Sequence, residues 1–214
     1  MNREIADMRE DYTRHELTRD QLDSSPMTQF EIWFDHATKS QIKEPNAMIL
    51  STVDSTGRPS ARTVLLKELE AKGFVFYTNY NSDKAKDIAD NPKVAITFLW
   101  KELERQVRIQ GKAVKVSHAK SLAYYHKRPK GSQIGAWVSP QSAVIADRSI
   151  LERRQAELND QYKDVDKLPL PENWGGFIIK PQIIEFWQGR SSRLHDRFRY
   201  TLESEQWKID RLAP

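Results

Sequence analysis

Five short β-rich runs between residues 47 and 116 constrain the fold of this chain more than any other feature. They span residues 47–54, 60–69, 74–79, 94–100 and 104–116, and turn-forming stretches such as 55–59 (STGRP) and 72–73 (KG) separate them. Closely spaced strands joined by tight turns indicate antiparallel pairing, because parallel strands need long crossover connections. The pattern therefore predicts an antiparallel barrel or sandwich rather than a βαβ fold.

Helical patterns flank and interrupt these strands. Ser25 and Pro26 have the residue types of an N-cap and a first helical position, and an apolar stripe at i, i+3, i+4 and i+7 follows them (Phe30, Trp33, Phe34 and Ala37). Further helices are predicted at 82–90, 118–128 and 147–162, and final strands at 177–187, 193–202 and 207–210. Residues 1–20 are polar and charged, so we expect a flexible N-terminal arm there and one α+β domain over residues 21–214.

The composition excludes several classes of protein. The 214 residues include no cysteine, which rules out disulfides, cysteine-ligated metals and thiol catalysis. No apolar run approaches about 18 residues and the N-terminus is charged, so we expect no membrane span, no signal peptide and a cytoplasmic location. The glycines form neither a GxGxxG nor a P-loop pattern, and the scattered histidines predict no metal site. The net charge of +4 mildly favours anionic partners.

Arg193, His195 and Arg197 form the densest set of donors in the chain. They follow two adjacent aromatics, Phe186 and Trp187, and alternate by two, so a strand here would point all three to one face. Guanidinium and imidazole donors on one face suit a planar, anionic or electron-rich ligand. A solvated, charge-rich edge strand explains the same three residues in isolation.

Arg62 and Lys67 place two cations in an otherwise apolar strand. Their positions have opposite parity, so an unbroken strand sends them to opposite faces. Only a bend or a strand end brings both to one ligand. Near the next helix start, Lys84 and free backbone N–H groups indicate a phosphate seat, although Ser82 as a plain N-cap explains that segment equally well.

Two further sets of polar residues are candidates for binding. Tyr124 and Arg128 share one helical face, and Pro129 then ends that helix before Ser132. Gln106 lies among charged and apolar residues, where it either binds a heterocycle edge or faces water.

Six segments together resemble the pyridoxine/pyridoxamine 5′-phosphate oxidase family, whose members are FMN-dependent enzymes. They run in the family's order: 62–67 (RTVLLK), 76–79 (FYTN), 104–108 (ERQVR), 128–137 (RPKGSQIGAW), 139–142 (SPQS) and 185–197 (EFWQGRSSRLHDR). Several separate motifs at compatible spacings are more specific than any one of them. The resemblance implies an α+β fold with an FMN-binding split β-barrel, an antiparallel Greek-key barrel with flanking helices.

The resemblance also implies a role for each matched residue. Arg193 and His195 would be catalytic and lie over the substrate ring. The implied substrate-binding set is Arg9, Tyr12, Lys67, Tyr124, Arg128, Ser132, Arg193 and His195, with Arg9 and Tyr12 closing over the substrate as a lid. The implied cofactor-binding set is Arg62, Thr63, Val64, Leu65, Leu66, Lys67, Tyr77, Thr78, Lys84, Gln106, Gln141, Ser142, Trp187 and Arg197.

Asp83 departs from the family pattern, in which a basic residue stands beside the FMN phosphate. An acid there weakens the contact, unless its side chain turns outward at the helix start.

The implied reaction is FMN-dependent oxidation of pyridoxine 5′-phosphate and pyridoxamine 5′-phosphate to pyridoxal 5′-phosphate, with O2 as electron acceptor and H2O2 as product. His195 would assist proton removal, although the sequence leaves open whether it or Arg193 does so. The implied partner is a second copy of the chain, in a homodimer with active sites at the subunit interface. Residues Phe98, Leu99 and Trp100 would then lie partly between subunits, and neither nucleic acid nor a membrane is expected as a partner.

Two other functions compete with this interpretation. Another split-barrel FMN oxidoreductase, such as a flavin reductase, would share the cofactor residues but lack the substrate-binding set. A basic β-barrel for single-stranded nucleic acid would explain the positive charge and the six tryptophans. It would not explain the ordered set of motifs.

Overall fold

The computed structural model describes residues 5, 8 and 10–214, and within them runs of strands are separated by helices. The helices are α1 (Pro26–Lys39), α2 (Asp83–Asp90), α3 (His118–Lys127), α4 (Lys130–Val138) and α5 (Ser149–Gln161). The strands are β1 (Ala47–Val53), β2 (Pro59–Leu65), β3 (Glu68–Glu70), β4 (Gly73–Asn79), β5 (Lys93–Trp100), β6 (Arg105–Lys115), β7 (Trp174–Gln188), β8 (Asp196–Glu203) and β9 (Gln206–Leu212). A 3-10 turn, η4 (Ser191–Arg193), precedes β8.

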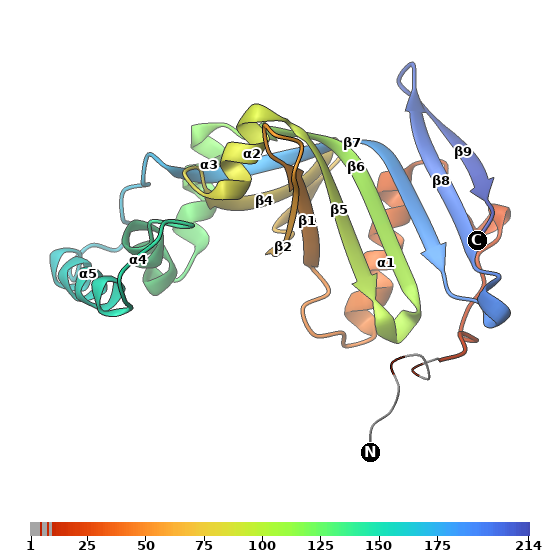
Figure 1. Cartoon of the computed structure of the whole chain (residues 1–214), viewed down its shortest axis with the longest axis horizontal. Helices are drawn as coiled ribbons and strands as arrows, with labels where there is room; N and C mark the ends of the chain where they lie inside the picture. The colour runs from red at the N-terminus through yellow and green to blue at the C-terminus, as the bar shows by residue number, and fades with distance from the viewer. Residues whose placement is uncertain (1–4, 6–7, 9) are drawn as a thin grey trace.

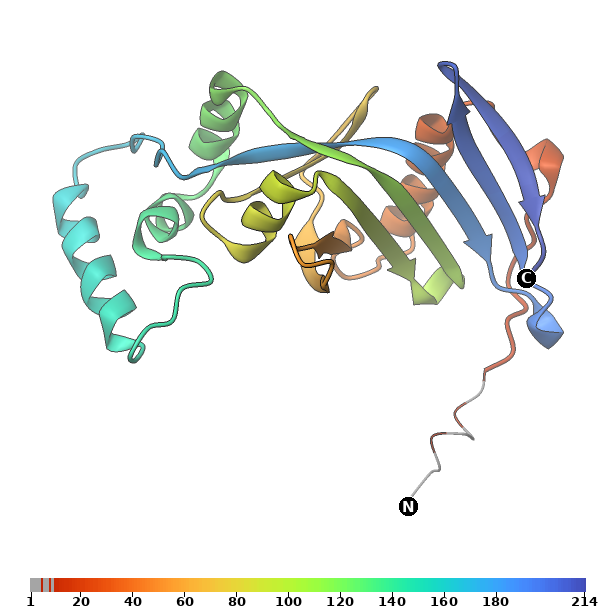
Figure 2. The ribbon, with the colours of Figure 1, turned by 45° about the horizontal axis from the view of Figure 1, so that its top comes forward.

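The strands form one antiparallel sheet that curls into a half-barrel (Figure 1). Their order is β2-β1-β5-β6-β7-β4-β3, and β8 and β9 extend the sheet from β7. β7 pairs with β4 over its first half, with β8 over its second half, and with β6 along its other side. β7 thus crosses the whole molecule and joins its two ends (Figure 2). The predicted antiparallel split-barrel fold is confirmed.

A bulge bends the β6–β7 pair near its middle. The register shifts between Gln110 and Gly111, opposite Pro181 of β7. Proline has no N–H for the ladder and is tolerated at such a bulge. A Cβ on Gly111 would lie 2.1 Å from the carbonyl oxygen of Lys180, so only glycine fits where the two backbones approach.

Helix α1 closes one face of the half-barrel, as its apolar stripe predicted. Ser25 accepts a hydrogen bond from the Thr28 N–H at 3.4 Å and so caps the helix. Phe30 is fully buried, with its ring centroid 4.9 Å from that of Phe74 and 5.0 Å from that of Phe98. Truncating such a core phenylalanine to alanine costs about 3–5 kcal/mol, so this contact holds the helix on the sheet.

Phe98 and Trp100 are buried in the core of the chain itself. The prediction that they lie between subunits is therefore wrong, because alternate residues of a strand face opposite sides of the sheet. Leu99 between them is 54% exposed and remains free to make such a contact.

Helices α3, α4 and α5 form a lobe at one end of the sheet (Figure 1). The lobe has its own small core of Tyr125, Ile134, Leu158, Leu168 and Trp174. Helix α4 was not predicted, because Pro129 was interpreted only as the end of α3. Proline also suits a helix start, since its fixed φ is already helical and it needs no N–H partner there. Pro129 occupies the N-cap position of α4, with φ −53°.

Candidate active site

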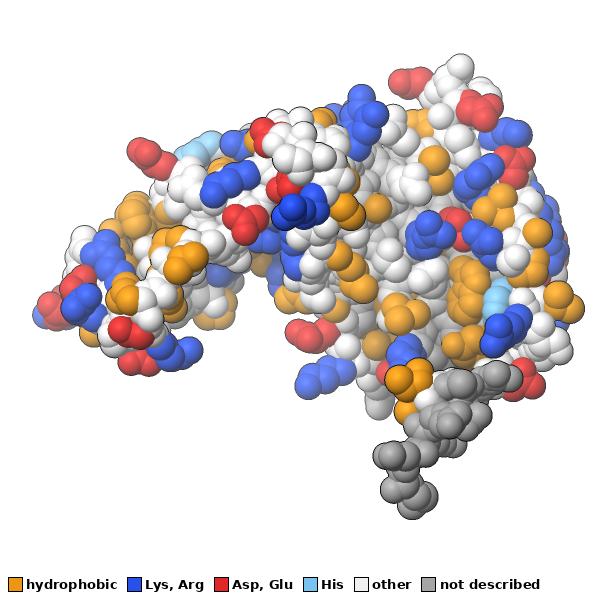
Figure 3. All heavy atoms as spheres, in the orientation of Figure 1, with side chains coloured by type: hydrophobic (Ala, Val, Ile, Leu, Met, Phe, Trp, Pro, Cys, Tyr) orange, Lys and Arg blue, Asp and Glu red, His pale blue; other side chains and the backbone are white. Residues whose placement is uncertain are grey.

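A cleft of about 780 Å³ opens between β2, β4, the start of α2 and the helical lobe. Ligand sites usually have volumes of about 300–1,000 Å³. The surface is hollowed between the lobe and the sheet (Figure 3). Thirteen residues of the predicted site line this cleft: Arg62, Thr63, Val64, Leu65, Lys67, Tyr77, Thr78, Lys84, Tyr124, Arg128, Ser132, Gln141 and Ser142.

Arg62 and Lys67 reach the same cleft because the chain changes its strand partner between them. β2 pairs with β1 and ends at Leu65. The Lys67 N–H then donates to the carbonyl of Val75 in β4, at 2.9 Å. The predicted single strand over 60–69 is therefore wrong, and the break removes the parity that would have separated the two cations. Leu66 is buried at this break and does not line the cleft.

Lys84 is a buried cation at the start of α2. Its ammonium lies 3.1 Å from Ser82 Oγ and 3.3 Å from Thr78 Oγ1, and only 8% of the residue is exposed. Among the residues that the structure describes, no carboxylate lies within 4 Å of it. Burial, and then the charge of Arg62, lowers the pKa of Lys84. A buried charge without a counter-ion is unfavourable, so this position favours a bound anion.

Ser82 does not act as a plain N-cap. Its Oγ donates to the carbonyl of Asn79 at 2.7 Å, and it makes no side-chain cap to the helix. The alternative explanation for this segment is therefore wrong.

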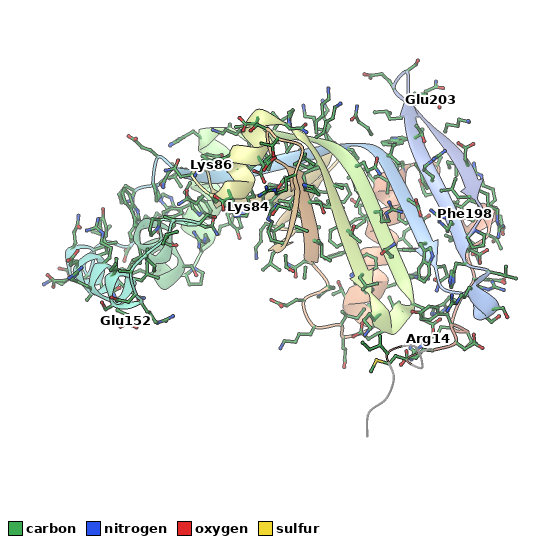
Figure 4. All side chains as sticks on the ribbon, viewed as in Figure 1. Arg14, Lys84, Lys86, Glu152, Phe198 and Glu203 are labelled. Carbon is green, nitrogen blue, oxygen red and sulfur yellow. The ribbon has the colours of Figure 1, made fainter. Side chains whose placement is uncertain are left out.

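Asp83 turns away from the buried cation. Its carboxylate is exposed and lies 3.9 Å from the ammonium of Lys86, one turn along α2. Its backbone N–H donates to Ser142 Oγ at 3.2 Å, which holds the 139–142 segment on the helix start. Figure 4 labels Lys84 and Lys86 on this helix. The acid that departs from the family pattern thus borders the cleft without occupying the anion position.

Arg128 follows α3 and packs on an aromatic wall of the cleft. Its guanidinium carbon lies 4.6 Å from the centre of the Trp174 ring. Its Nη1 is buried and has no hydrogen-bond partner among the residues that the structure describes, and burial lowers the pKa of the guanidinium. Buried polar atoms are nearly always paired, so an orphaned donor facing a cleft indicates an anionic ligand.

Tyr77 and Tyr124 stack in the same wall, with ring centroids 3.8 Å apart and planes within 9°. The hydroxyl of Tyr77 donates to Glu68 Oε1 at 2.8 Å, and Lys120 pairs with the other oxygen of Glu68 at 3.0 Å. Burial, and then this hydrogen bond, raises the pKa of Tyr77. The Tyr77 ring lines the cleft while its hydroxyl is already satisfied by Glu68.

A second group of predicted residues lies at the opposite end of β7. Trp187 and His195 have ring centroids 4.6 Å apart, and Tyr12 lies 5.8 Å from Trp187 and 5.9 Å from His195. Gln106 pairs with Trp187 across β6 and β7. A hollow of about 520 Å³ borders Tyr12, Arg193 and His195.

Arg193 and His195 lie on a turn rather than on a strand. Residues 191–193 form η4, Arg193 has a left-handed φ of 61°, and β8 begins only at Asp196. The prediction that Arg193, His195 and Arg197 share one strand face is wrong for this reason. Arg197 is on β8, where Nε and Nη2 both contact Glu185 Oε1 at 2.9 Å.

The two groups are too far apart in one chain to bind the same small ligand. Tyr77 is paired with Gly176, whereas Gln106 is paired with Trp187, eleven residues further along β7. At about 3.3 Å per residue these positions lie about 35 Å apart along the strand, and a site of the usual volume is roughly 10 Å across. Figure 4 shows the separation, with Lys84 beside the lobe and Arg14 near the other end.

Some predictions for the arm and for other sites are only partly covered. Arg9 lies outside the described residues. Leu17 is buried and its N–H donates to Asp196, so that part of the arm is held on the domain.

In the part of the chain that the structure describes, no helix is long and apolar enough to cross a membrane, and no cluster of His, Asp and Glu could hold a metal ion.

Comparison with known families agrees with this arrangement. Residues 34–162 match the family described as pyridoxamine 5′-phosphate oxidase. Residues 174–214 match the pyridoxine 5′-phosphate oxidase C-terminal dimerisation region. The chain belongs to the pyridoxine/pyridoxamine 5′-phosphate oxidase family. The second match begins at Trp174 and covers β7, β8 and β9, and it includes Trp187, Arg193, His195 and Arg197 of the second group.

Individual relatives of this oxidase family match over their whole length. The pyridoxine/pyridoxamine 5′-phosphate oxidase of Crocosphaera subtropica is 55% identical, with 99% of this chain and 100% of the relative covered. A relative named pyridoxine/pyridoxamine 5′-phosphate oxidase 2, from Hydrogenovibrio crunogenus, is 52% identical with full coverage of both chains.

Solved structures share the fold. PhzG from Burkholderia lata 383, in complex with tetrahydrophenazine-1-carboxylic acid, has a TM-score of 0.87 and 29% identity over 92% of this chain and 98% of its own. A pyridoxamine 5′-phosphate oxidase-related, FMN binding protein from Nostoc punctiforme has a TM-score of 0.70 and 19% identity, over 89% and 98%. This second likeness supports the split-barrel fold alone.

Sequence reasoning missed several residues that line or support the cleft. Trp174 and Asn79 line the cleft, and Glu68 accepts a hydrogen bond from the hydroxyl of Tyr77. Asn79 directly follows the predicted Tyr77-Thr78 pair, and that adjacency was a usable signal. Trp174 had none, because it lies 46 residues from Arg128 and meets it only in the folded chain.

Proposed function

We propose that this chain catalyses the FMN-dependent oxidation of pyridoxine 5′-phosphate and pyridoxamine 5′-phosphate to pyridoxal 5′-phosphate. Full-length identity of 50–55% to oxidases of this name supports the reaction. The observation in the fold that supports it best is the cleft with the buried cation Lys84 and the half-buried cation Arg128, whose Nη1 atom is buried. Neither cation has a carboxylate partner within the described residues. Two anion positions suit two phosphates, one from the cofactor and one from the substrate.

When bound, FMN would supply the redox chemistry of the oxidation, with O2 as the final electron acceptor and H2O2 as the product. Arg62, Thr78, Lys84 and Ser142 would hold its phosphate. They place two cations and two hydroxyls at one corner of the cleft. Lys84 is held in place by Thr78 and Ser82, so little side-chain entropy is lost when it binds a ligand oxygen.

The substrate phosphate would bind Lys67, Tyr124, Arg128 and Ser132. All four line the same cleft, and they supply two cations and two hydroxyl donors. Trp174 and Tyr77 hold Arg128 and Tyr124 by stacking, so the donors keep their positions before the substrate arrives.

Arg193 and His195 would act on the substrate ring from a second copy of the chain. Within one chain they lie at the far end of β7 from the cleft, so one chain alone does not complete the site. The C-terminal dimerisation region contains both residues and supports a homodimer with its active sites at the interface. Gln106, Trp187 and Arg197 would reach the flavin from the same side.

The N-terminal arm would cover this second group as a lid. Tyr12 packs on Trp187 and His195, which supports the proposal. A cytoplasmic location remains a prediction.

Identification of the released cofactor tests the function directly. The purified protein should be yellow and release FMN, and with either phosphorylated substrate it should produce pyridoxal 5′-phosphate and H2O2 in equal amounts. A protein that holds FMN but oxidises neither substrate would contradict the proposal.

A further inference from the structure

Arg190 contacts three separate parts of the second group of residues. Its backbone N–H donates to Nδ1 of His195 at 3.1 Å. Its Nη1 lies 3.0 Å from Glu16 Oε2 on the N-terminal arm and 3.3 Å from Asp196 Oδ2 at the start of β8. One residue therefore joins the imidazole, the arm and the strand.

The backbone contact determines which nitrogen of His195 carries the proton. An N–H group only donates, so Nδ1 must accept, and a neutral imidazole that accepts at Nδ1 has its proton on Nε2. Protonation would give the ring its second proton, on Nδ1, and so break this hydrogen bond. Burial, and then the charge of Arg193, lowers the pKa of His195 in the same direction.

Asp196 anchors the side chain of Arg190. Its carboxylate is buried, with 6% of the residue exposed. Oδ2 accepts from Arg190 and from the backbone N–H of Leu17 on the arm, at 3.1 Å, and Oδ1 pairs with Arg211 of β9. A buried carboxylate with this many donors is fully paired, so it is a rigid point of attachment.

The turn between Arg190 and His195 needs such support. Ser192 and Arg193 have left-handed φ values of 55° and 61°, which are unfavourable for residues other than glycine. Conformations of this kind persist only where surrounding contacts hold them. The Leu194 N–H donates to the Ser191 carbonyl within the turn, at 3.1 Å, and Arg190 and Asp196 make contacts at its two ends.

The arm packs closely over the same turn. A Cβ on Gly189 would lie 2.8 Å from Cγ of Tyr12, so the Tyr12 ring rests directly on the backbone beside Arg190. Leu17 is 3% exposed, and Arg190 pairs with Glu16 next to it. The arm is thus attached on the carboxyl side of Tyr12, through Asp196 and Arg190.

We propose that Arg190 is a positioning residue for the oxidase reaction. Its backbone N–H keeps the His195 proton on Nε2, and its side chain fastens the arm so that Tyr12 covers the imidazole. This inference rests on the roles proposed above for His195 and Tyr12. It makes His195 a hydrogen-bond donor toward the substrate through Nε2, and not the group that removes a proton.

Other charged groups also face this imidazole. Arg193 lies on the same turn, and Glu10 and Asp11 of the arm border the same hollow. The acids favour protonation of the ring and Arg193 opposes it, whereas the Arg190 N–H specifically selects the tautomer.

The first test is Arg190→Ala, read by hydrogen exchange of the Leu17 amide in the FMN-loaded protein. Loss of the guanidinium should speed this exchange by about 10-fold and lower kcat/KM by a similar factor, while the FMN content stays unchanged. Arg190→Lys should restore part of both. Arg154→Ala, which removes an exposed arginine paired with Glu157 on α5, is the matched control and should change neither. Unchanged Leu17 exchange in Arg190→Ala would overturn the role of the side chain.

Glu16→Gln keeps the test valid if Arg190→Ala does not fold. This change removes the pairing of Arg190 with the exposed Glu16 and leaves its pairing with the buried Asp196. Hydrogen exchange of the Leu17 amide should therefore increase by about 2- to 5-fold. No increase would count against the attachment of the arm.

The second test is the ¹⁵N NMR spectrum of the His195 ring. The wild-type protein and Arg190→Ala should both show the Nε2–H tautomer, because alanine keeps the backbone N–H that donates to Nδ1. A ring protonated on Nδ1 in either protein would overturn the proposal. The exchange and NMR measurements need no turnover, so they stand even if the proposed oxidase activity is not found.

Discussion

Replacing Arg128 with alanine separates substrate binding from stability more clearly than any other single change. The guanidinium packs on Trp174, and its buried Nη1 has no partner in the described structure. In the proposed function this nitrogen donates to the substrate phosphate. The variant removes a contact that exists only when substrate is bound.

The structure sets the expected size of each effect. A lost hydrogen bond to a charged group costs about 1.5–3 kcal/mol, which corresponds to a rise in KM of roughly 10- to 150-fold. Loss of the cation–π contact with Trp174 costs about 0.5–2 kcal/mol of stability. Removal of the buried Nη1, which has no partner among the described residues, increases stability by about 1–3 kcal/mol. The two stability effects nearly cancel, so the free energy of unfolding should change by less than about 2 kcal/mol.

The assay compares phosphorylated and unphosphorylated pyridoxine on the wild type and on Arg128→Ala. KM for the phosphorylated substrate should rise strongly, while kcat/KM for unphosphorylated pyridoxine changes less than about threefold. FMN content and the unfolding midpoint serve as controls for folding. An equal loss for both substrates, or a large fall in stability, would show that Arg128 is structural and refute the reasoning.

Four further predictions follow from the same site. Lys84→Met should weaken FMN binding by about 10-fold or more, measured by flavin fluorescence. The free energy of unfolding of the FMN-free protein should stay unchanged or rise, because a buried cation without a counter-ion is removed. An unchanged affinity for FMN would contradict a phosphate-binding role for Lys84. Asp83→Asn should raise FMN affinity by about 2- to 5-fold at low salt, since an exposed acid near an anion site is worth a few tenths to one kcal/mol; no change in FMN affinity would show that Asp83 is too well screened. The protein should be a dimer in light scattering, and a monomer holding one FMN per chain would refute the two-chain site. Because burial, and then the charge of Arg193, lowers the pKa of His195 from its ordinary value of about 6.5, the neutral form is retained above that pH, and kcat/KM should fall only on the acidic side of it; a limb on the alkaline side instead would contradict this.

Much of the fold was readable from local patterns. The strand runs, the tight turns and the apolar stripe of α1 each depend on residues within about ten positions of one another, so their physical causes are present in the sequence. The choice of antiparallel pairing followed from connection length alone. The elements most poorly predicted were short ones after a proline or at a strand end, such as α4 and the break after Leu65.

The candidate site was predicted as residue types, and the chain folds thirteen of them around one cleft. The cations, hydroxyls and aromatics needed for two phosphates and a flavin are visible as motifs. The contacts that hold these side chains in place are not visible as motifs. Arg128 packs on Trp174, Tyr77 is hydrogen-bonded to Glu68 and Arg190 pairs with Asp196, and no motif predicts any of these contacts.

The sequence by itself determined which chemistry this chain can carry and which class of sheet displays it, because residue type and two-residue periodicity are local properties. Only the tertiary structure decided which residues meet. Arg62 and Lys67 face one cleft because the chain exchanges β1 for β4 as its partner. Arg193 and His195 lie on a turn whose two ends are held by long-range contacts of Arg190 with Glu16 and of Asp196 with Leu17. The length of β7 then places these two groups at opposite ends of one chain, a separation that depends on strand pairing rather than on any motif.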